Sequence, residues 1–257
     1  MSVTVLVLLS QISAGAIVAR VKESEAKIRD LTAVARLETV SAGETRKRVF
    51  DFSLLRPGKT DKTDTTDKTV SYRARVRLLE PAEMEGTEFL IHAERGKRNQ
   101  QWAYFPDLDL VRDIPGKSED DPFLGSDITY ADLAGGAHLD DLHHRLLGEE
   151  TVESEPCYVM EGVPKHRVAY GKLRGFIRKK DFVVVKAEFY SHDGELLKEA
   201  LLSDVRDLGG VPLAHRIEVK SPAEDRRTVL TFEEVRVNQG LAPGAFTPEA
   251  LGSDEPR

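Results

Sequence analysis

Cysteine is nearly absent from this chain of 257 residues, in which Cys157 is the single thiol. One thiol cannot close a disulfide within the chain, and it cannot build a cysteine-based zinc site. Long apolar runs are missing too. The apolar stretch Val3–Leu9 is too short for a transmembrane helix. A net charge of −7 argues against general attraction to nucleic acid. The chain is 40% hydrophobic and 32% charged, which is typical of a folded globular domain.

The usual catalytic motifs are also missing. The sequence has no G-x-S-x-G, H-E-x-x-H or G-x-G-x-x-G pattern. Gly58–Thr60 and Gly116–Ser118 resemble the end of a phosphate-binding loop, but Ser53 and Val111 occupy the places of its first glycine. We therefore expect neither an enzyme nor a bound cofactor.

One segment contains the residue types of a metal site. If residues 138–144 form a helix, Asp140 and His144 share a face, and His138 lies beside Asp141. Imidazole and carboxylate together suit divalent ions. Because a third or fourth ligand is not evident, we expect no metal, and a hydrolase built on His143 and its neighbours has little support.

The first residues have features of an export signal. Val3–Leu9 is almost wholly apolar, and Ser13–Ala16 offers small residues like those of a cleavage site. The basic start of such a signal is missing, since the first Lys or Arg is Arg20. We expect an exported protein with a signal peptide over residues 1–16 that is incomplete at its N terminus.

Two periodicities predict the secondary structure. Apolar residues at three- and four-residue steps predict helices over Ala14–Leu37 and Tyr130–Leu147. Alternation with period two predicts strands over Phe50–Leu54 and Tyr72–Leu78, and the polar residues 57–69 between them predict a hairpin loop. Similar patterns predict more strands at Thr87–His92, Gln101–Phe105, Leu110–Ile114, Val183–Phe189, Leu196–Leu202, Leu213–Val219 and Thr228–Val237.

Consecutive strands with short turns predict an α+β fold, in which a strongly curved antiparallel sheet forms a half-barrel and helices cover its concave face. We expect one domain over residues 17–251 and a polar tail at 252–257. An apolar cavity between sheet and helices would bind lipid, and its candidate lining is Tyr72, Val76, Leu78, Phe89, Ile91, Trp102, Tyr104, Val183, Val185 and Phe189. The alternative is that these residues form an ordinary filled core, since alternation does not distinguish the two.

Three stretches carry a resemblance to a known family. They are Arg75–Ile91 with its Pro-x-x-Met-x-Gly-Thr element, Gln101–Pro106, and Phe123–Leu133, which begins Phe-Leu-Gly-Ser-Asp. Together they resemble the outer-membrane lipoprotein-sorting proteins, relatives of the periplasmic carrier LolA, and the resemblance covers nearly the whole chain after the expected signal. Within the last stretch, Gly125–Asp127 predicts a turn in which Asp127 caps the following segment.

The resemblance implies a LolA-like half-barrel in the periplasm that handles lipid or lipoprotein acyl chains and moves them toward the outer membrane. It implies an acylated cargo, an inner-membrane transporter that supplies it and an outer-membrane acceptor. We expect a monomer that binds no nucleic acid. The alternative is a non-enzymatic envelope sensor or scaffold on the same fold, with a partner on a charged face such as residues 118–156, where one basic residue stands against eleven acidic ones.

Overall fold

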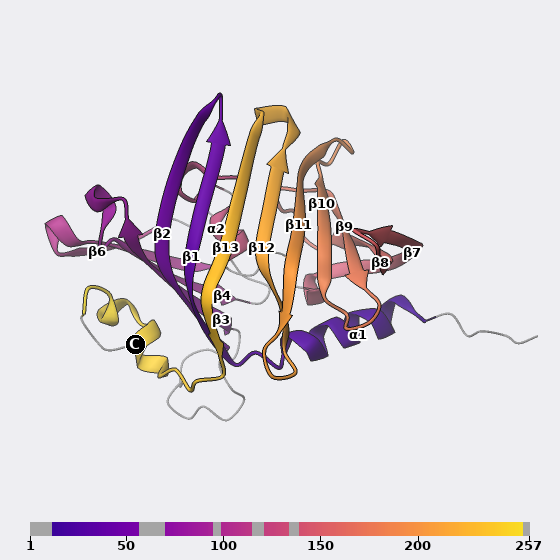
Figure 1. Ribbon diagram of the computed structural model, residues 1–257, viewed down its shortest axis with the longest axis horizontal. Helices are drawn as coiled ribbons and strands as arrows, with labels where there is room; N and C mark the ends of the chain where they lie inside the picture. Colours follow the sequence, from indigo (N-terminus) through magenta and orange to yellow (C-terminus); the bar gives the residue numbers. More distant parts are fainter. Residues whose placement is uncertain (1–11, 57–69, 95–98, 115–120, 134–138, 254–257) are drawn as a thin grey trace, which may run out of the picture.

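The computed structural model describes residues 12–56, 70–94, 99–114, 121–133 and 139–253, which form one antiparallel sheet of thirteen strands and a helix, α1, Ala14–Glu25 (Figure 1). The strands are β1 Asp30–Ser41, β2 Glu44–Leu55, β3 Val70–Glu80, β4 Glu88–Glu94, β5 Gln100–Phe105, β6 Leu110–Asp113, β7 Leu142–Val152, β8 Glu155–Pro164, β9 Lys172–Arg178, β10 Val184–Tyr190, β11 Leu196–Asp207, β12 Pro212–Ser221 and β13 Arg226–Val237. None of the helices in the described ranges has the length and apolar content that a membrane crossing needs.

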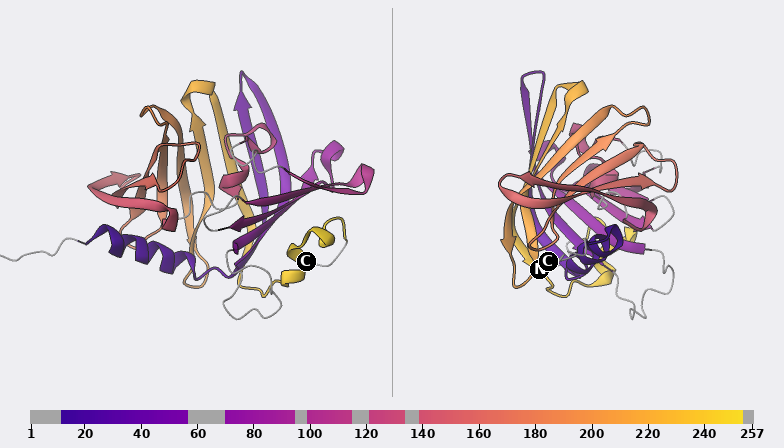
Figure 2. Two further views of the ribbon diagram at one scale, coloured as in Figure 1. Left: turned by 180° about the vertical axis from the view of Figure 1, so that it is seen from behind. Right: turned by 90° about the vertical axis from the view of Figure 1, so that its right-hand side faces the viewer.

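The order of strands across the sheet is β6-β5-β4-β3-β2-β1-β13-β12-β11-β10-β9-β8-β7. It consists of two meanders, β1 to β6 and β7 to β13, joined where β1 pairs with β13 and Leu37 lies opposite Leu230. The sheet is open, with β6 and β7 at its two edges, and Figure 2 shows that it bends. The connection from β6 to β7 must therefore cross from one edge of the sheet to the other.

The expected helix over Ala14–Leu37 is wrong beyond its first twelve residues, because β1 follows. Leu31 and Ala35 stand four positions apart, a spacing that suits one face of a helix and one face of a strand equally. Ala33 and Leu37 occupy the remaining positions of that strand face, and all four side chains are buried. Burial on the sheet therefore decides the conformation of this segment.

The expected helix over Tyr130–Leu147 is wrong for a similar reason. Of the described residues in this range, Tyr130–Leu133 form the short α-helix α2, Leu139–Asp141 form a single 3-10 turn, and β7 begins at Leu142. Leu142 and Leu146 are again four residues apart, and Leu146 lies opposite Met160 in the β7–β8 ladder. The leucine spacing thus reflects one side of an edge strand.

Every strand that the sequence predicted is confirmed, but β2 begins six residues earlier than predicted, at Glu44, and β11 ends five residues later, at Asp207. β1, β7 and β9 were not predicted as strands, whereas the apolar run Cys157–Met160, which predicts a strand, lies in β8. The expected hairpin loop at 57–69 and most of the expected signal peptide lie outside the described residues, as do the last four residues of the polar tail. Ser13, at the expected cleavage site, caps α1, because its Oγ accepts a hydrogen bond from the Ala16 amide at 3.2 Å.

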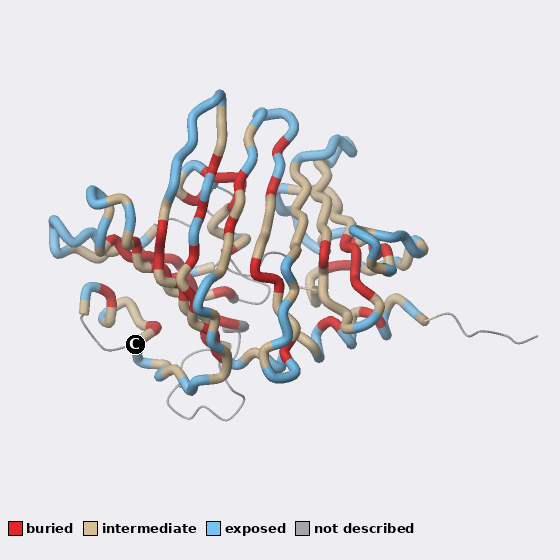
Figure 3. The backbone as a smooth tube through the Cα atoms, viewed as in Figure 1, coloured by how far each residue is buried: buried red, intermediate tan, exposed pale blue. Residues whose placement is uncertain are grey.

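The C-terminal segment, residues 241–251, covers one face of β3–β5. Phe246 and Leu251 are buried there against Leu90, and Trp102 packs at the margin of the same cluster. In Figure 3 the tube near the C terminus includes buried residues, which are coloured red. The segment therefore belongs to the fold and is not a loose tail.

A buried ion pair joins the C-terminal segment to the sheet. Arg75 Nη2 lies 2.6 Å from Glu88 Oε2, and the Glu88 side chain is 1% exposed. The same guanidinium donates to the carbonyl oxygens of Ala245 and Ala250, at 3.1 and 3.2 Å. One arginine thus neutralises a buried carboxylate and satisfies two backbone carbonyls.

Replacing Arg75→Ala should lower the free energy of unfolding by about 3–5 kcal/mol, because it leaves the Glu88 carboxylate buried without its closest cation. Urea denaturation measures the loss. Arg77→Ala is the matched control on the same strand, since Arg77 is 41% exposed and 4.0 Å from Glu88, and it should cost about 0–1 kcal/mol. Equal losses in the two variants would contradict the assignment.

Candidate binding face

One face of the sheet is apolar across most of its width, and we call it the apolar face. Val76 lies opposite Phe89 in the β3–β4 ladder. In the second meander Leu230 lies opposite Ile217, and Ile217 lies opposite Leu202. Directly paired residues point to the same side of a sheet, and the Leu37–Leu230 pair links the two meanders, so both contribute to this face.

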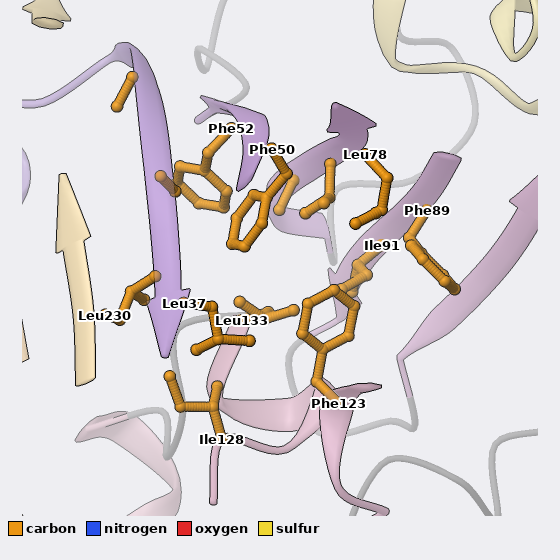
Figure 4. Packing of buried hydrophobic residues seen from close by; sticks show 14 of the residues in the cluster. Leu37, Phe50, Phe52, Leu78, Phe89, Ile91, Phe123, Ile128, Leu133 and Leu230 are labelled. Carbon is orange, nitrogen blue, oxygen red and sulfur yellow. The ribbon is translucent and has the colours of Figure 1, made fainter. Parts of the chain in front are cut away.

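A strap segment, residues 121–133, packs on the apolar face as part of the connection from β6 to β7. Phe123 is fully buried, and its ring centroid lies 5.3 Å from that of Phe89 in an edge-to-face contact. Ile128 and Leu133 are buried in the same cluster (Figure 4). Three apolar side chains therefore fasten the strap segment to the sheet.

Asp127 fastens the strap segment to β13 through polar contacts. Its buried carboxylate accepts hydrogen bonds from Arg226 Nε at 2.9 Å and from the Thr228 hydroxyl at 2.7 Å. The expectation that Asp127 caps the following segment is wrong, because Thr129 and Asp132 form the reciprocal cap of α2. The carboxylate of Asp127 instead bonds across to the sheet.

A second ion pair holds the C-terminal end of the strap segment. Lys198 Nζ on β11 lies 2.5 Å from Asp132 Oδ2, and both side chains are about a quarter exposed or less. The same ammonium lies 4.9 Å from the centroid of Phe189, its partner in the β10–β11 ladder. The strap segment is thus tied to β13 at one point and to β11 at another.

Helix α1 packs on the same face at the far end of the sheet. Ile17 and Val21 are buried against Met160 and Ile177. Met160 lies opposite Gly175, which lies opposite Ala187, so the pairing leads back to β11 and the apolar face. Between the part of the face that the strap segment covers and the part that α1 covers, a strip of apolar side chains is only half-buried by the described residues. Its members are Leu173, Phe189, Ala200, Leu202 and Ile217.

The ten candidate lining residues do not all lie together. Five are buried on the apolar face in the main core: Tyr72, Val76, Leu78, Phe89 and Ile91. Phe189 is half-buried on the same face. Burial raises the pKa of the Tyr72 hydroxyl, and the Arg56 guanidinium, 5.7 Å from the ring centroid, opposes part of that rise.

The other four candidates lie elsewhere. Trp102 and Tyr104 are on the opposite face, in the cluster under the C-terminal segment. Val183 and Val185 pack around Cys157 in a separate small cluster. Alternation identified residues that share a side within each strand, but it could not tell which side of β5 faces the main core.

The segment with metal-ligand residue types is not an α-helix, because Leu139–Asp141 form a single 3-10 turn and β7 begins at Leu142. Asp140 Oδ1 lies 2.6 Å from Lys22 Nζ on α1, and His144 Nε2 lies 2.6 Å from the Leu139 carbonyl oxygen. His138 lies outside the described residues. Within the described ranges, no group of three or more His, Cys, Asp or Glu side chains is placed to hold an ion.

A pocket of about 420 Å³ lies beside α1, between the turns that follow β9 and β11. Several of its charged residues already have partners: Arg178 forms an ion pair with Asp181 at 2.6 Å, and Lys180 pairs with Glu155. Lys27 donates to the Gly210 carbonyl oxygen. The pocket is polar, so it does not extend the apolar face.

Sequence reasoning missed a buried amide on the apolar face. Gln101 is 2% exposed and lies opposite Ile91. Its Nε2 and Oε1 have no hydrogen-bond partner among the described residues. A glutamine at the start of a strand gives no sign in the sequence that it is buried. The Asp127 and Asp132 contacts were missed because their partners are distant in the chain.

Comparison with known families and structures agrees with this architecture. A family model described as an uncharacterized protein family matches residues 71–253. No protein with a curated description matches the chain. A DUF1329 family protein from Desulfovibrio piger has a TM-score of 0.82 and 24% identity, with 94% of this chain and 100% of that chain covered.

Two further crystal structures are similar. A putative outer membrane lipoprotein-sorting protein domain from Vibrio parahaemolyticus has a TM-score of 0.79 and 22% identity, covering 91% of this chain and 97% of its own. A LolA superfamily protein from Nitrosomonas europaea has a TM-score of 0.68 and 21% identity, covering 92% of this chain and 98% of its own. These similarities show a shared fold, as the family resemblance implied.

Replacing Phe123→Ala should lower the free energy of unfolding by about 3–5 kcal/mol, because it removes a fully buried ring from the core of the apolar face. Thermal and urea denaturation measure the change. Leu108→Ala is the control, since Leu108 is 65% exposed, and it should change stability by less than about 0.5 kcal/mol. A loss below about 1 kcal/mol for Phe123→Ala would show that the strap segment is not docked as described.

Proposed function

The chain belongs to a family of uncharacterized proteins with the LolA-like fold, and we propose that it is a periplasmic, non-enzymatic carrier of lipid or lipoprotein acyl chains. In this proposal the acyl chain lies on the apolar face, along the half-buried strip between the strap segment and α1. The cargo is moved toward the outer membrane.

The half-buried strip between the strap segment and α1 is the observation that carries the proposal. Leu202 and Ile217 lie opposite each other in the β11–β12 ladder, and Phe189 lies one strand away. The strap segment and α1 do not fully cover these side chains, which are therefore only half-buried by the described residues. An apolar strip continuous with the core, on the face that both coverings pack against, suits a hydrocarbon chain.

The energetics explain why a soluble carrier is required. Each buried methylene contributes about 0.8 kcal/mol, so a chain of ~16 carbons costs roughly 13 kcal/mol in water. Free transfer between two membranes is then negligible. The apolar face can offset that cost without any titrating group doing chemistry.

The same proposal supplies localisation and partners. A carrier of this kind works in the periplasm, takes its cargo from an inner-membrane transporter and delivers it to an outer-membrane acceptor. The outer membrane lipoprotein-sorting domain and the LolA superfamily protein with which it shares its fold support this assignment. We propose that it acts as a monomer.

Leu202→Glu should abolish acyl-chain binding, because it places a carboxylate against hydrocarbon on the apolar face. Leu201→Glu is the matched control: Leu201 is also half-buried, but it lies opposite Glu218 and points to the other side. Each protein is purified from a membrane-containing host, and its bound lipid is measured by native mass spectrometry and organic extraction.

The expected result is an acylated species on the wild type and on Leu201→Glu, reduced at least about tenfold on Leu202→Glu. Circular dichroism confirms that each variant is folded. If the wild type carries no lipid and takes up no fluorescent fatty acid, the carrier proposal is wrong. Equal loading of all three proteins would place the lipid away from the apolar face.

A further inference from the structure

Gln101 is a polar group buried in an apolar setting. Its side chain is 2% exposed, and both amide atoms lack a hydrogen-bond partner among the described residues. Buried amides in folded proteins are almost always bonded, because an unmade hydrogen bond leaves the desolvation cost uncompensated. An amide in this state indicates that something outside the described chain completes its bonding.

The place of Gln101 in the sheet shows what its amide faces. On β5 it alternates with Ala103, which is buried opposite Phe89 in the main core, so both point to the apolar face. Its own partner across the ladder is Ile91. The preceding residue, Gln100, is exposed and points to the opposite side. The unpartnered amide therefore lies next to Ile91 and Ala103 on the apolar face, the face where we place the acyl chain.

The chemistry of a carboxamide limits the group that can complete it. The side chain presents one acceptor oxygen and two N–H donors from a single planar edge. An un-ionised carboxylic acid or another carboxamide presents the matching acceptor and donor side by side. An ester offers only an acceptor, a hydrocarbon offers neither, and a carboxylate would bring an unpaired charge into an apolar site.

We propose that Gln101 is a binding residue for the carbonyl end of an acyl ligand, and that the ligand class is fatty amides and un-ionised fatty acids. The inference rests on the proposed function and deepens it, since the hydrocarbon chain is bound by the apolar face and the head by Gln101. It predicts selectivity for the head group at constant chain length.

The test measures displacement of anilinonaphthalenesulfonate from the full chain by dodecanamide, dodecanoic acid, methyl dodecanoate and dodecane. The wild type should bind dodecanamide roughly tenfold more tightly than dodecane, with the ester between them. The amide can form two hydrogen bonds with Gln101, whereas dodecane can form none. A gain for dodecanoic acid as well supports the whole proposed ligand class. A gain for the amide alone overturns its fatty-acid part.

Gln101→Met keeps the length of the side chain and removes both polar atoms. It should bind dodecane like the wild type, lose the tenfold preference for the amide, and unfold at an equal or higher temperature without ligand. Gln100→Met, the matched control on the opposite face, should keep the preference. The thermal midpoint distinguishes lost recognition from lost folding.

The two proposals fail in different ways. If Gln101→Met keeps the amide preference, or if the wild type binds all four compounds equally, the acyl chain still binds but the role of Gln101 is overturned. If no compound displaces the dye from the wild type, the carrier proposal fails and the role of Gln101 fails with it. A lower unfolding temperature for Gln101→Met without ligand would show that the amide is already bonded within the protein.

Discussion

The pairing of β1 with β13 is the constraint on which the rest of the structure depends. It joins the first strand of the chain to the last, with Leu31 opposite Val237, while every other ladder joins strands that are consecutive in sequence. Because the two ends of the strand series meet in the middle, the edges of the sheet are strands from the centre of the chain. The connection between those edges must then cross a face of the sheet.

That crossing places the strap segment on the apolar face. Phe123 packs into the core, and Asp127 bonds to Arg226 and Thr228 on β13, the strand that completes the central pairing. Contacts that look local to one loop therefore depend on residues about a hundred positions away. The proposed binding strip exists because the strap segment and α1 cover different parts of one wide sheet and leave the apolar side chains between them half-buried.

Two polar features give the face its chemical character. Lys198 joins α2 to β11 beside the Phe189 ring, which keeps a charge close to an apolar strip. Gln101 places an amide within the hydrocarbon surface at the other meander. A fold that only needed a filled core would gain stability from an apolar residue at Gln101, so its presence there is consistent with selection for a ligand head group.

The sequence by itself determined most strands and which side chains share a side within each of them, because period-two alternation in Tyr72–Leu78 depends only on strand geometry. It also carried the family resemblance. Tertiary structure alone decided whether Leu31 and Ala35 lie on a helix or a strand, since a four-residue step fits both. It likewise decided that Trp102 faces the C-terminal segment while Gln101 faces the core, because which side of a strand is buried depends on what packs against it. That partner comes from distant parts of the chain, and no local pattern encodes it.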